Sequence, residues 1–150
     1  MPKIDRKLNK AIVLAAGGTG GHVFPAEALA DIMLEGGNAE IARVICDDRT
    51  AAFCKAGALG KSPITILRFW RFNKPSLKWQ LLNIICFSLS NIKNTLHVFF
   101  SFIISRPTLV VSFGGYPTFA AVLSATILRI PFMLHEQNAV IGRVNRWFAP

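Results

Sequence analysis

Two glycine-rich segments and one run of polar side chains hold the residue types best suited to chemistry. Residues 17–22 read Gly-Gly-Thr-Gly-Gly-His, residues 112–117 read Ser-Phe-Gly-Gly-Tyr-Pro, and residues 135–138 read His-Glu-Gln-Asn. Glycines let a backbone approach a ligand closely, and amides at a helix N-terminus favour an anion. An imidazole beside such a site can act as a base or donate to phosphate. The pattern predicts an anion site with His22 as a candidate base; a histidine that only caps its own helix is the alternative.

The first glycine segment differs from two common phosphate-binding motifs. It lacks the Lys-Ser/Thr ending of a P-loop, and although Gly18 and Gly20 fit the dinucleotide fingerprint, no third glycine follows near Phe24. A purely structural turn therefore stays open as an interpretation. The polar run at 135–138 directly follows apolar residues, where unpaired polar groups are costly. That position favours a functional use of the run.

Each of these segments follows a short apolar run that predicts a buried strand. We expect strands at 11–16, 41–46, 64–67, 109–113 and 131–134, and helices at 25–35, 49–56, 82–103, 117–128 and 140–148. Pro25 is expected in the first turn of its helix. The alternation predicts an α/β fold, with a Rossmann-like parallel sheet and helices on both faces. Ligands in such sheets bind beyond the carboxyl ends of the strands, where the three segments can meet.

The longest predicted helix carries a regular apolar stripe with spacings of three and four residues. Its members are Leu82, Ile85, Leu89, Ile92, Leu96, Phe99 and Ile103. Such a stripe predicts the face that packs on the core. The wider segment 77–105 is the one candidate for a membrane span, but a polar cluster at 91–95 would lie near its middle. We therefore expect no transmembrane helix.

Charge is distributed unevenly along the 150 residues, whose net charge is +9. Residues 1–48 hold 5 basic and 7 acidic groups, whereas residues 49–150 hold 12 basic groups and the single acid Glu136. This asymmetry suggests an anionic partner, which could be nucleic acid, a phosphorylated ligand or an anionic membrane surface. Nucleic acid is not expected, because no recognised binding motif is present and Phe, Leu and Ile dilute the basic residues.

The cysteines and acids argue against disulfides and metals. Three cysteines at wide spacing form neither a disulfide framework nor a zinc pattern, which fits a reducing compartment. Asp47 and Asp48 are adjacent rather than spaced as paired metal ligands, and they could simply cap the helix that follows. We expect no metal, and no cofactor is predicted.

Taken together, the motifs resemble the MurG family of peptidoglycan glycosyltransferases. The similarity rests on Gly-Gly-Thr-Gly-Gly-His-Val-Phe-Pro, on Gly-Gly-Tyr-Pro, and on Ile-Pro-Phe-Met-Leu-His-Glu-Gln-Asn-Ala-Val-Ile-Gly-Arg-Val-Asn-Arg, in this order and spacing. The resemblance implies a GT-B architecture, of which residues 1–150 form the N-terminal, Rossmann-like lipid-acceptor domain without the C-terminal donor domain.

The resemblance also implies a reaction. N-acetylglucosamine passes from UDP-N-acetylglucosamine to the 4-hydroxyl of MurNAc in lipid I (undecaprenyl-pyrophosphoryl-MurNAc-pentapeptide), with inversion, to form lipid II. The alternative is a non-catalytic, acceptor-binding fragment of such an enzyme. The family works peripherally at the cytoplasmic face of the bacterial inner membrane, so an anionic membrane surface is a further expected partner.

Roles for individual residues follow from the same resemblance. The catalytic candidates are His22 and Glu136. The donor-binding candidates are Thr19, Gly20, Gly21 and Asn138. The candidates for holding the acceptor pyrophosphate are Gly17, Gly18, Gly114, Gly115 and Tyr116. The expected membrane patch, basic and aromatic, consists of Arg68, Trp70, Arg71, Lys74, Lys78 and Trp79.

Overall fold

The computed structural model describes residues 11–37, 40–70 and 77–149, with side chains in the last range from Trp79 onward. The elements in chain order are β1 (Ala11–Ala15), α1 (Gly20–Gly36), β2 (Glu40–Asp47), α2 (Ala51–Ala56), the 3-10 helix η1 (Ala58–Lys61), β3 (Ile64–Leu67), α3 (Leu77–Ser105), β4 (Leu109–Ser112), α4 (Thr118–Ile127), β5 (Phe132–Leu134) and α5 (Arg143–Phe148). The expected alternation of strands and helices is confirmed.

Within the described residues, five parallel strands form one sheet in the order β3-β2-β1-β4-β5. The chain runs outward from β1 to β3 and then returns to place β4 on the other side of β1. Ala15 at the end of β1 aligns with Ile45 on β2 and with Ser112 on β4. The loops after β1 and β4 therefore start side by side at the topological switch point, where open α/β sheets bind their ligands.

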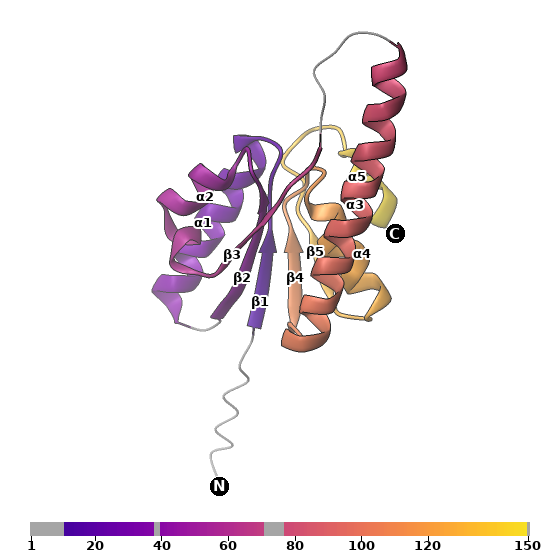
Figure 1. Cartoon of the computed structure of the whole chain (residues 1–150). Coiled ribbons are helices and arrows are strands. Elements are labelled where there is room, and N and C mark those ends of the chain that lie inside the picture. The colour runs from indigo at the N-terminus through magenta and orange to yellow at the C-terminus, as the bar shows by residue number, and fades with distance from the viewer. Residues whose placement is uncertain (1–10, 38–39, 71–76, 150) are drawn as a thin grey trace, which may run out of the picture.

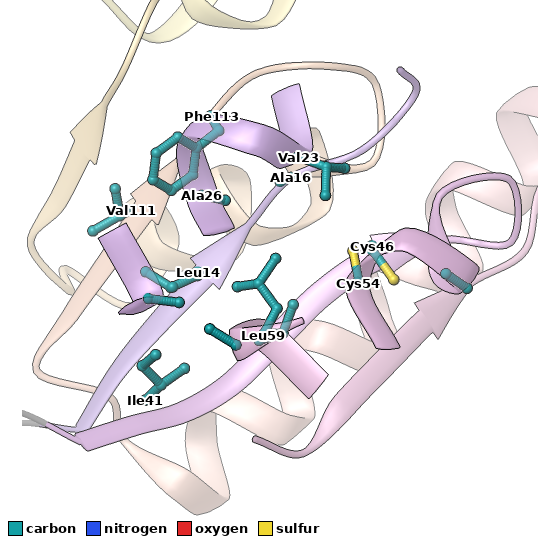
Figure 2. Packing of buried hydrophobic residues seen from close by; sticks show 14 residues of the cluster. Leu14, Ala16, Val23, Ala26, Ile41, Cys46, Cys54, Leu59, Val111 and Phe113 are labelled. Carbon is teal, nitrogen blue, oxygen red and sulfur yellow. The ribbon is translucent and has the colours of Figure 1, made fainter. Parts of the chain in front are cut away.

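Helices cover both faces of the sheet, as the sequence predicts (Figure 1). Helices α1 and α2 lie over one face, and α3 and α4 over the other. Neighbouring β1 residues point to opposite faces, so Leu14 belongs to one buried cluster and Val13 to the other. Figure 2 shows Leu14 and Leu59 in the first cluster, with the sulfur atoms of Cys46 and Cys54 close together at its border. Burial on both faces explains why the central strand β1 is apolar at every position.

Helix α1 begins earlier than the sequence pattern predicts. It starts at Gly20, because Thr19 takes an extended conformation and forms the N-cap, so Pro25 lies inside the helix rather than in its first turn. It ends at Gly36, and Gly37 forms a left-handed C-cap. The early start places the free amides of the first helical turn within the glycine segment itself.

The expected core face of α3 is wrong. Six of the seven stripe residues are between 37% and 59% exposed, and Phe99 is half-buried. The buried residues of α3 instead recur every fourth position; they are Cys86, Ser90, Asn94, Val98 and Phe102. Ser90 Oγ accepts a hydrogen bond from the backbone N–H of Trp70 (3.2 Å), and Asn94 Nδ2 donates to the Arg68 carbonyl (2.9 Å). Polar side chains suit this face because the segment after β3 brings backbone groups that need hydrogen-bond partners.

Packing on that narrow face leaves a broad apolar surface of α3 in contact with solvent. Besides the stripe residues, it includes Leu81, Ile84, Phe100 and Ile104. In the part of the chain that the structure describes, no helix is both long and apolar enough to cross a membrane.

Candidate active site

The two glycine loops pack directly against each other at the switch point. Gly115 has a φ of +87°, and a Cβ built on it would lie 2.1 Å from the carbonyl oxygen of Gly17. Gly18 has a φ of +85°, and its Cβ would lie 3.4 Å from the ring of Tyr116. Only glycine combines this backbone conformation with so close an approach. The contact therefore explains why glycines stand in both loops.

His22 lies in the first turn of α1 and faces the second glycine loop. Cβ atoms built on Gly114 and Gly115 would lie 3.1 Å and 3.4 Å from its imidazole ring. Its Nδ1 and the hydroxyl of Thr19 are 3.0 Å apart, within hydrogen-bond distance. Burial lowers the pKa of His22, while the charge of Glu136 and a hydrogen bond to the backbone of Gly17 act in the opposite direction. The imidazole is therefore neutral at neutral pH and able to take up a proton.

A buried carboxylate that the sequence did not single out joins the two loops. Asp47, at the end of β2, is fully buried, and its Oδ1 accepts a hydrogen bond from the N–H of Gly18 (3.1 Å). The hydroxyls of Thr50 and Tyr116 also donate to this carboxylate. Burial alone would raise the pKa of Asp47, but the hydrogen bonds from Thr50, Tyr116 and Gly18 outweigh it and lower the pKa.

The sequence left helix capping as a possible role for Asp47. The structure shows that its carboxylate also bonds both glycine loops. Helix α2 starts at Ala51 with Thr50 as its N-cap, and the carboxylate of Asp47 points to the glycine loops. Two adjacent acids at the end of a predicted strand were the sequence signal for this buried carboxylate. The sequence did not reveal which of the two side chains would be buried.

Glu136 organises the loop between β5 and α5. Its Oε1 accepts hydrogen bonds from the backbone N–H and the side-chain Nδ2 of Asn138 (3.1 and 2.9 Å). Its Oε2 accepts from the N–H of Gly142 (2.8 Å) and from Nδ2 of Asn145 (3.0 Å). The bond from Gly142, together with those from Asn138 and Asn145, holds the pKa of Glu136 below its usual value. This carboxylate is thus ionised at neutral pH and held by four donors.

Asn145 connects the Glu136 loop to the glycine loops, and the sequence motifs did not point to its role. It is buried, and its Nδ2 also donates to the carbonyl of His135 (3.0 Å). A Cβ on Gly114 would lie 3.7 Å from the same Nδ2 atom. The structure therefore brings all three polar segments together at the carboxyl ends of β1, β4 and β5.

The expected donor-binding residues lie at the open side of this cluster. Thr19 and Gly21 are exposed at the start of α1, with Gly20 half-buried between them. Asn138 is exposed on the Glu136 loop. Free amides at the start of a helix can hold an anion, and an exposed amide side chain can hydrogen-bond a sugar or phosphate oxygen.

The expected membrane patch lies on the segment after β3, whose Phe69 packs edge to face against Tyr116 of the second glycine loop with ring centroids 4.7 Å apart. Arg68 is exposed, and Trp70 is 66% exposed, which excludes a core position for that ring. Trp79, in the first turns of α3, is half-buried. The other expected members lie outside the described residues or side chains; these are Arg71, Lys74 and Lys78.

Comparison with known proteins identifies relatives over most of the chain. A family model described as the glycosyltransferase family 28 N-terminal domain matches residues 12–150. The UDP-N-acetylglucosamine--N-acetylmuramyl-(pentapeptide) pyrophosphoryl-undecaprenol N-acetylglucosamine transferase of Rhodospirillum centenum is 46% identical over 140 residues, which cover 92% of this chain and 34% of the relative. The enzyme of the same name from Rhodopseudomonas palustris is 38% identical over 145 residues, or 93% of this chain and 36% of that protein.

A solved structure agrees with these relatives. The crystal structure of Acinetobacter baumannii MurG superposes with a TM-score of 0.74 at 26% identity, over 92% of this chain and 38% of that one. The match confirms the Rossmann-like α/β fold expected from the sequence. The chain spans about a third of the length of the curated relatives it matches.

Proposed function

Because the chain belongs to glycosyltransferase family 28, we propose that residues 1–150 form the lipid-acceptor domain of an inverting N-acetylglucosaminyltransferase. Its relatives are named for transfer to the pyrophosphoryl-undecaprenol-linked muramyl pentapeptide. The reaction moves N-acetylglucosamine from UDP-N-acetylglucosamine to the 4-hydroxyl of MurNAc in lipid I and yields lipid II.

The observation that carries this proposal is the position of His22 between the two glycine loops. Its imidazole leaves little room for a Cβ on Gly114 or Gly115, and it is neutral because burial lowers its pKa. A hydroxyl group bound beside these loops would meet a base that is free to accept its proton.

Each remaining group has a part in the transfer. His22 takes the proton from the attacking hydroxyl, and the negative charge of Glu136 stabilises the imidazolium that forms. The glycine loops hold the acceptor diphosphate through backbone amides other than that of Gly18, which is bonded to Asp47. Amides at the start of α1, together with Asn138, bind the donor and offset the charge that develops on the leaving diphosphate.

Replacing His22 tests the catalytic role. In an active enzyme that contains this domain, we expect His22→Ala to lower turnover by about 10²–10⁴-fold, the usual scale for a lost general base, with little change in donor binding. His97→Ala is the matched control, because His97 is exposed on α3 outside the site. Transfer of labelled N-acetylglucosamine to lipid I in vesicles measures the effect. An unchanged turnover number in His22→Ala would remove His22 from catalysis.

The domain also works at a membrane surface, which its lipid-linked acceptor requires. The patch residues Arg68 and Trp70 follow β3 at the same sheet edge as the glycine loops, and both are exposed. Aromatic rings suit the headgroup level of a bilayer, and each basic residue near an anionic surface contributes about 1 kcal/mol. The binding is peripheral, at the cytoplasmic face of the inner membrane, where the UDP-linked donor is available.

Sedimentation with vesicles tests this part of the proposal. Binding should require anionic lipid, weaken as salt rises, and fall steeply when Arg68, Arg71, Lys74 and Lys78 are changed to Ser. Arg106→Ser with Arg129→Ser is the control, because these exposed arginines precede β4 and β5 at the opposite edge of the sheet. Equal, salt-insensitive binding to neutral vesicles would contradict the electrostatic mechanism.

A second candidate function is acceptor binding without transfer. It is favoured by the two glycine loops, the expected site of the acceptor diphosphate, which pack against each other within this chain. The two functions differ in a single assay. Saturable lipid I binding with no N-acetylglucosamine transfer by the 150-residue chain would favour the binding role, whereas transfer by this chain alone would exclude it.

A further inference from the structure

A groove lined mostly by aromatic and aliphatic side chains lies beside the second glycine loop. It has a volume of about 500 Å³ and runs between α3, α4 and α5. Phe87 and Ile92 of α3 form one wall, and Phe119 of α4 and Trp147 of α5 form the other. The rings of Phe119 and Trp147 meet edge to face with centroids 5.8 Å apart. Trp147 is 72% exposed and Ile92 57% exposed, so the groove presents apolar surface to solvent.

Tyr116 belongs to both this groove and the glycine loops. It follows Gly115 in the chain, lines the groove, and packs against Phe87 with ring centroids 6.0 Å apart. Its hydroxyl donates to the buried carboxylate of Asp47, which also holds the N–H of Gly18. The ring is therefore fixed in position, and the groove begins where the two glycine loops meet.

Charge at the groove points to the kind of ligand it would take. Arg143, the first residue of α5, is exposed and is the one ionisable side chain other than Tyr116 that lines the groove within the described residues. Asn91 is satisfied locally, because its Nδ2 donates to the carbonyl of Phe87 (2.8 Å). A ligand that is anionic at one end and a slender hydrocarbon beyond it would match both the arginine and the rings.

From this geometry we propose that the groove binds the first isoprene units of a polyprenyl diphosphate whose diphosphate lies on the glycine loops. The inference rests on the proposed function, because it takes the acceptor to be a polyprenyl-linked diphosphate. It adds a binding site for the hydrocarbon chain that begins at Tyr116. Burial of apolar surface that is otherwise exposed to water supplies the affinity.

Calorimetry with farnesyl diphosphate, farnesol and inorganic pyrophosphate tests the site on the 150-residue chain. We expect farnesyl diphosphate to bind at least about tenfold more tightly than pyrophosphate. Trp147→Ala and Ile92→Glu should remove most of that difference while leaving pyrophosphate binding unchanged. Arg143→Ser should weaken binding of farnesyl diphosphate but not of farnesol.

Phe53→Ala is the control, because this exposed ring lies on α2 over the opposite face of the sheet. Circular dichroism confirms that each variant is folded.

The outcomes separate this inference from the proposed function. If both Trp147→Ala and Ile92→Glu still bind farnesyl diphosphate more tightly than pyrophosphate by the original factor, the groove does not bind the prenyl chain. This conclusion holds whether or not pyrophosphate itself binds. If Trp147→Ala instead dissociates a dimer without changing prenyl binding, a second copy of the chain covers the groove and the inference fails. Farnesol binding that is lost in Trp147→Ala, with no pyrophosphate binding at all, would support the groove and contradict the diphosphate site of the proposed function.

Discussion

Helix α3 and Tyr116 of the second glycine loop line the same groove, yet different forces hold α3 and the two glycine loops in place. The loops are held by polar contacts to a buried carboxylate, since Asp47 bonds Gly18 and Tyr116 from two loops at once. Helix α3 is held by one narrow buried face and by its packing on α4, with Val98 and Phe102 fully buried between α4 and the sheet. Most of its apolar side chains face solvent instead.

This difference teaches which residues can be replaced in each region. In the loops, a small change of shape or charge affects several contacts, because the segments touch through backbone atoms. Along α3, the loss of stability caused by a replacement depends on whether the side chain is buried or exposed. Residues adjacent in sequence can therefore differ widely in this loss. Three pairs of variants, in order of decreasing expected effect, test this contrast.

The largest effect is expected within α3, from two adjacent residues. Phe102 is fully buried, so Phe102→Ala should lower the free energy of unfolding by about 3–5 kcal/mol, because it leaves a cavity. Ile103 is 44% exposed, and Ile103→Ala should cost less than about 1 kcal/mol. Urea unfolding followed by circular dichroism measures both values. Equal losses would show that the stripe containing Ile103 packs on the core after all.

The next effect is expected at the contact between the glycine loops. A Cβ on Gly115 would clash with the Gly17 carbonyl oxygen, so Gly115→Ala should cost at least about 3 kcal/mol, because the loops must separate. Gly37 also has a positive φ, but nothing lies within 4 Å of a Cβ built there. Gly37→Ala should therefore lower the free energy of unfolding only through backbone strain, by about 1–2 kcal/mol. If the two variants unfold at the same urea concentration, the loops do not touch in solution.

The smallest of the three effects is expected at Asp47. Asp47→Asn keeps the shape of the side chain but removes the negative charge to which three donors bond. It should therefore lower the free energy of unfolding by about 2 kcal/mol at pH 7. The exposed neighbour serves as the control, and Asp48→Asn should change stability by less than about 0.5 kcal/mol.

The cost of Asp47→Asn should also depend on pH. The folded state lowers the pKa of Asp47, so its carboxylate contributes stability above the unfolded-state pKa, and this contribution is lost as pH falls through the lower folded-state value. The difference in free energy of unfolding between Asp47→Asn and the unchanged protein should therefore be constant near neutral pH and shrink below about pH 4. Urea titrations between pH 3 and pH 7 measure it, and a difference that does not vary with pH would remove Asp47 as a charged anchor.

Local sequence signals were sufficient for much of the fold and for the outline of the site. Short apolar runs ending in glycine or polar residues predicted each strand that the described residues form, and their alternation with helices predicted a parallel sheet. The parallel order in turn placed residues 17–22, 114–117 and 135–138 at one edge, which the structure confirms. These inferences succeed because strand and turn preferences depend mainly on neighbouring residues.

Other features were decided only when the elements packed together. The inward face of α3 was set by the segment after β3, whose backbone groups needed Ser90 and Asn94 as partners, and an apolar stripe could not reveal this. The roles of Asp47 and Asn145 likewise depend on contacts with residues distant in sequence. Hydrophobic periodicity records which side chains are apolar, whereas the partners of a buried polar group are fixed only by tertiary structure, because that group must find its hydrogen bonds wherever the fold brings them.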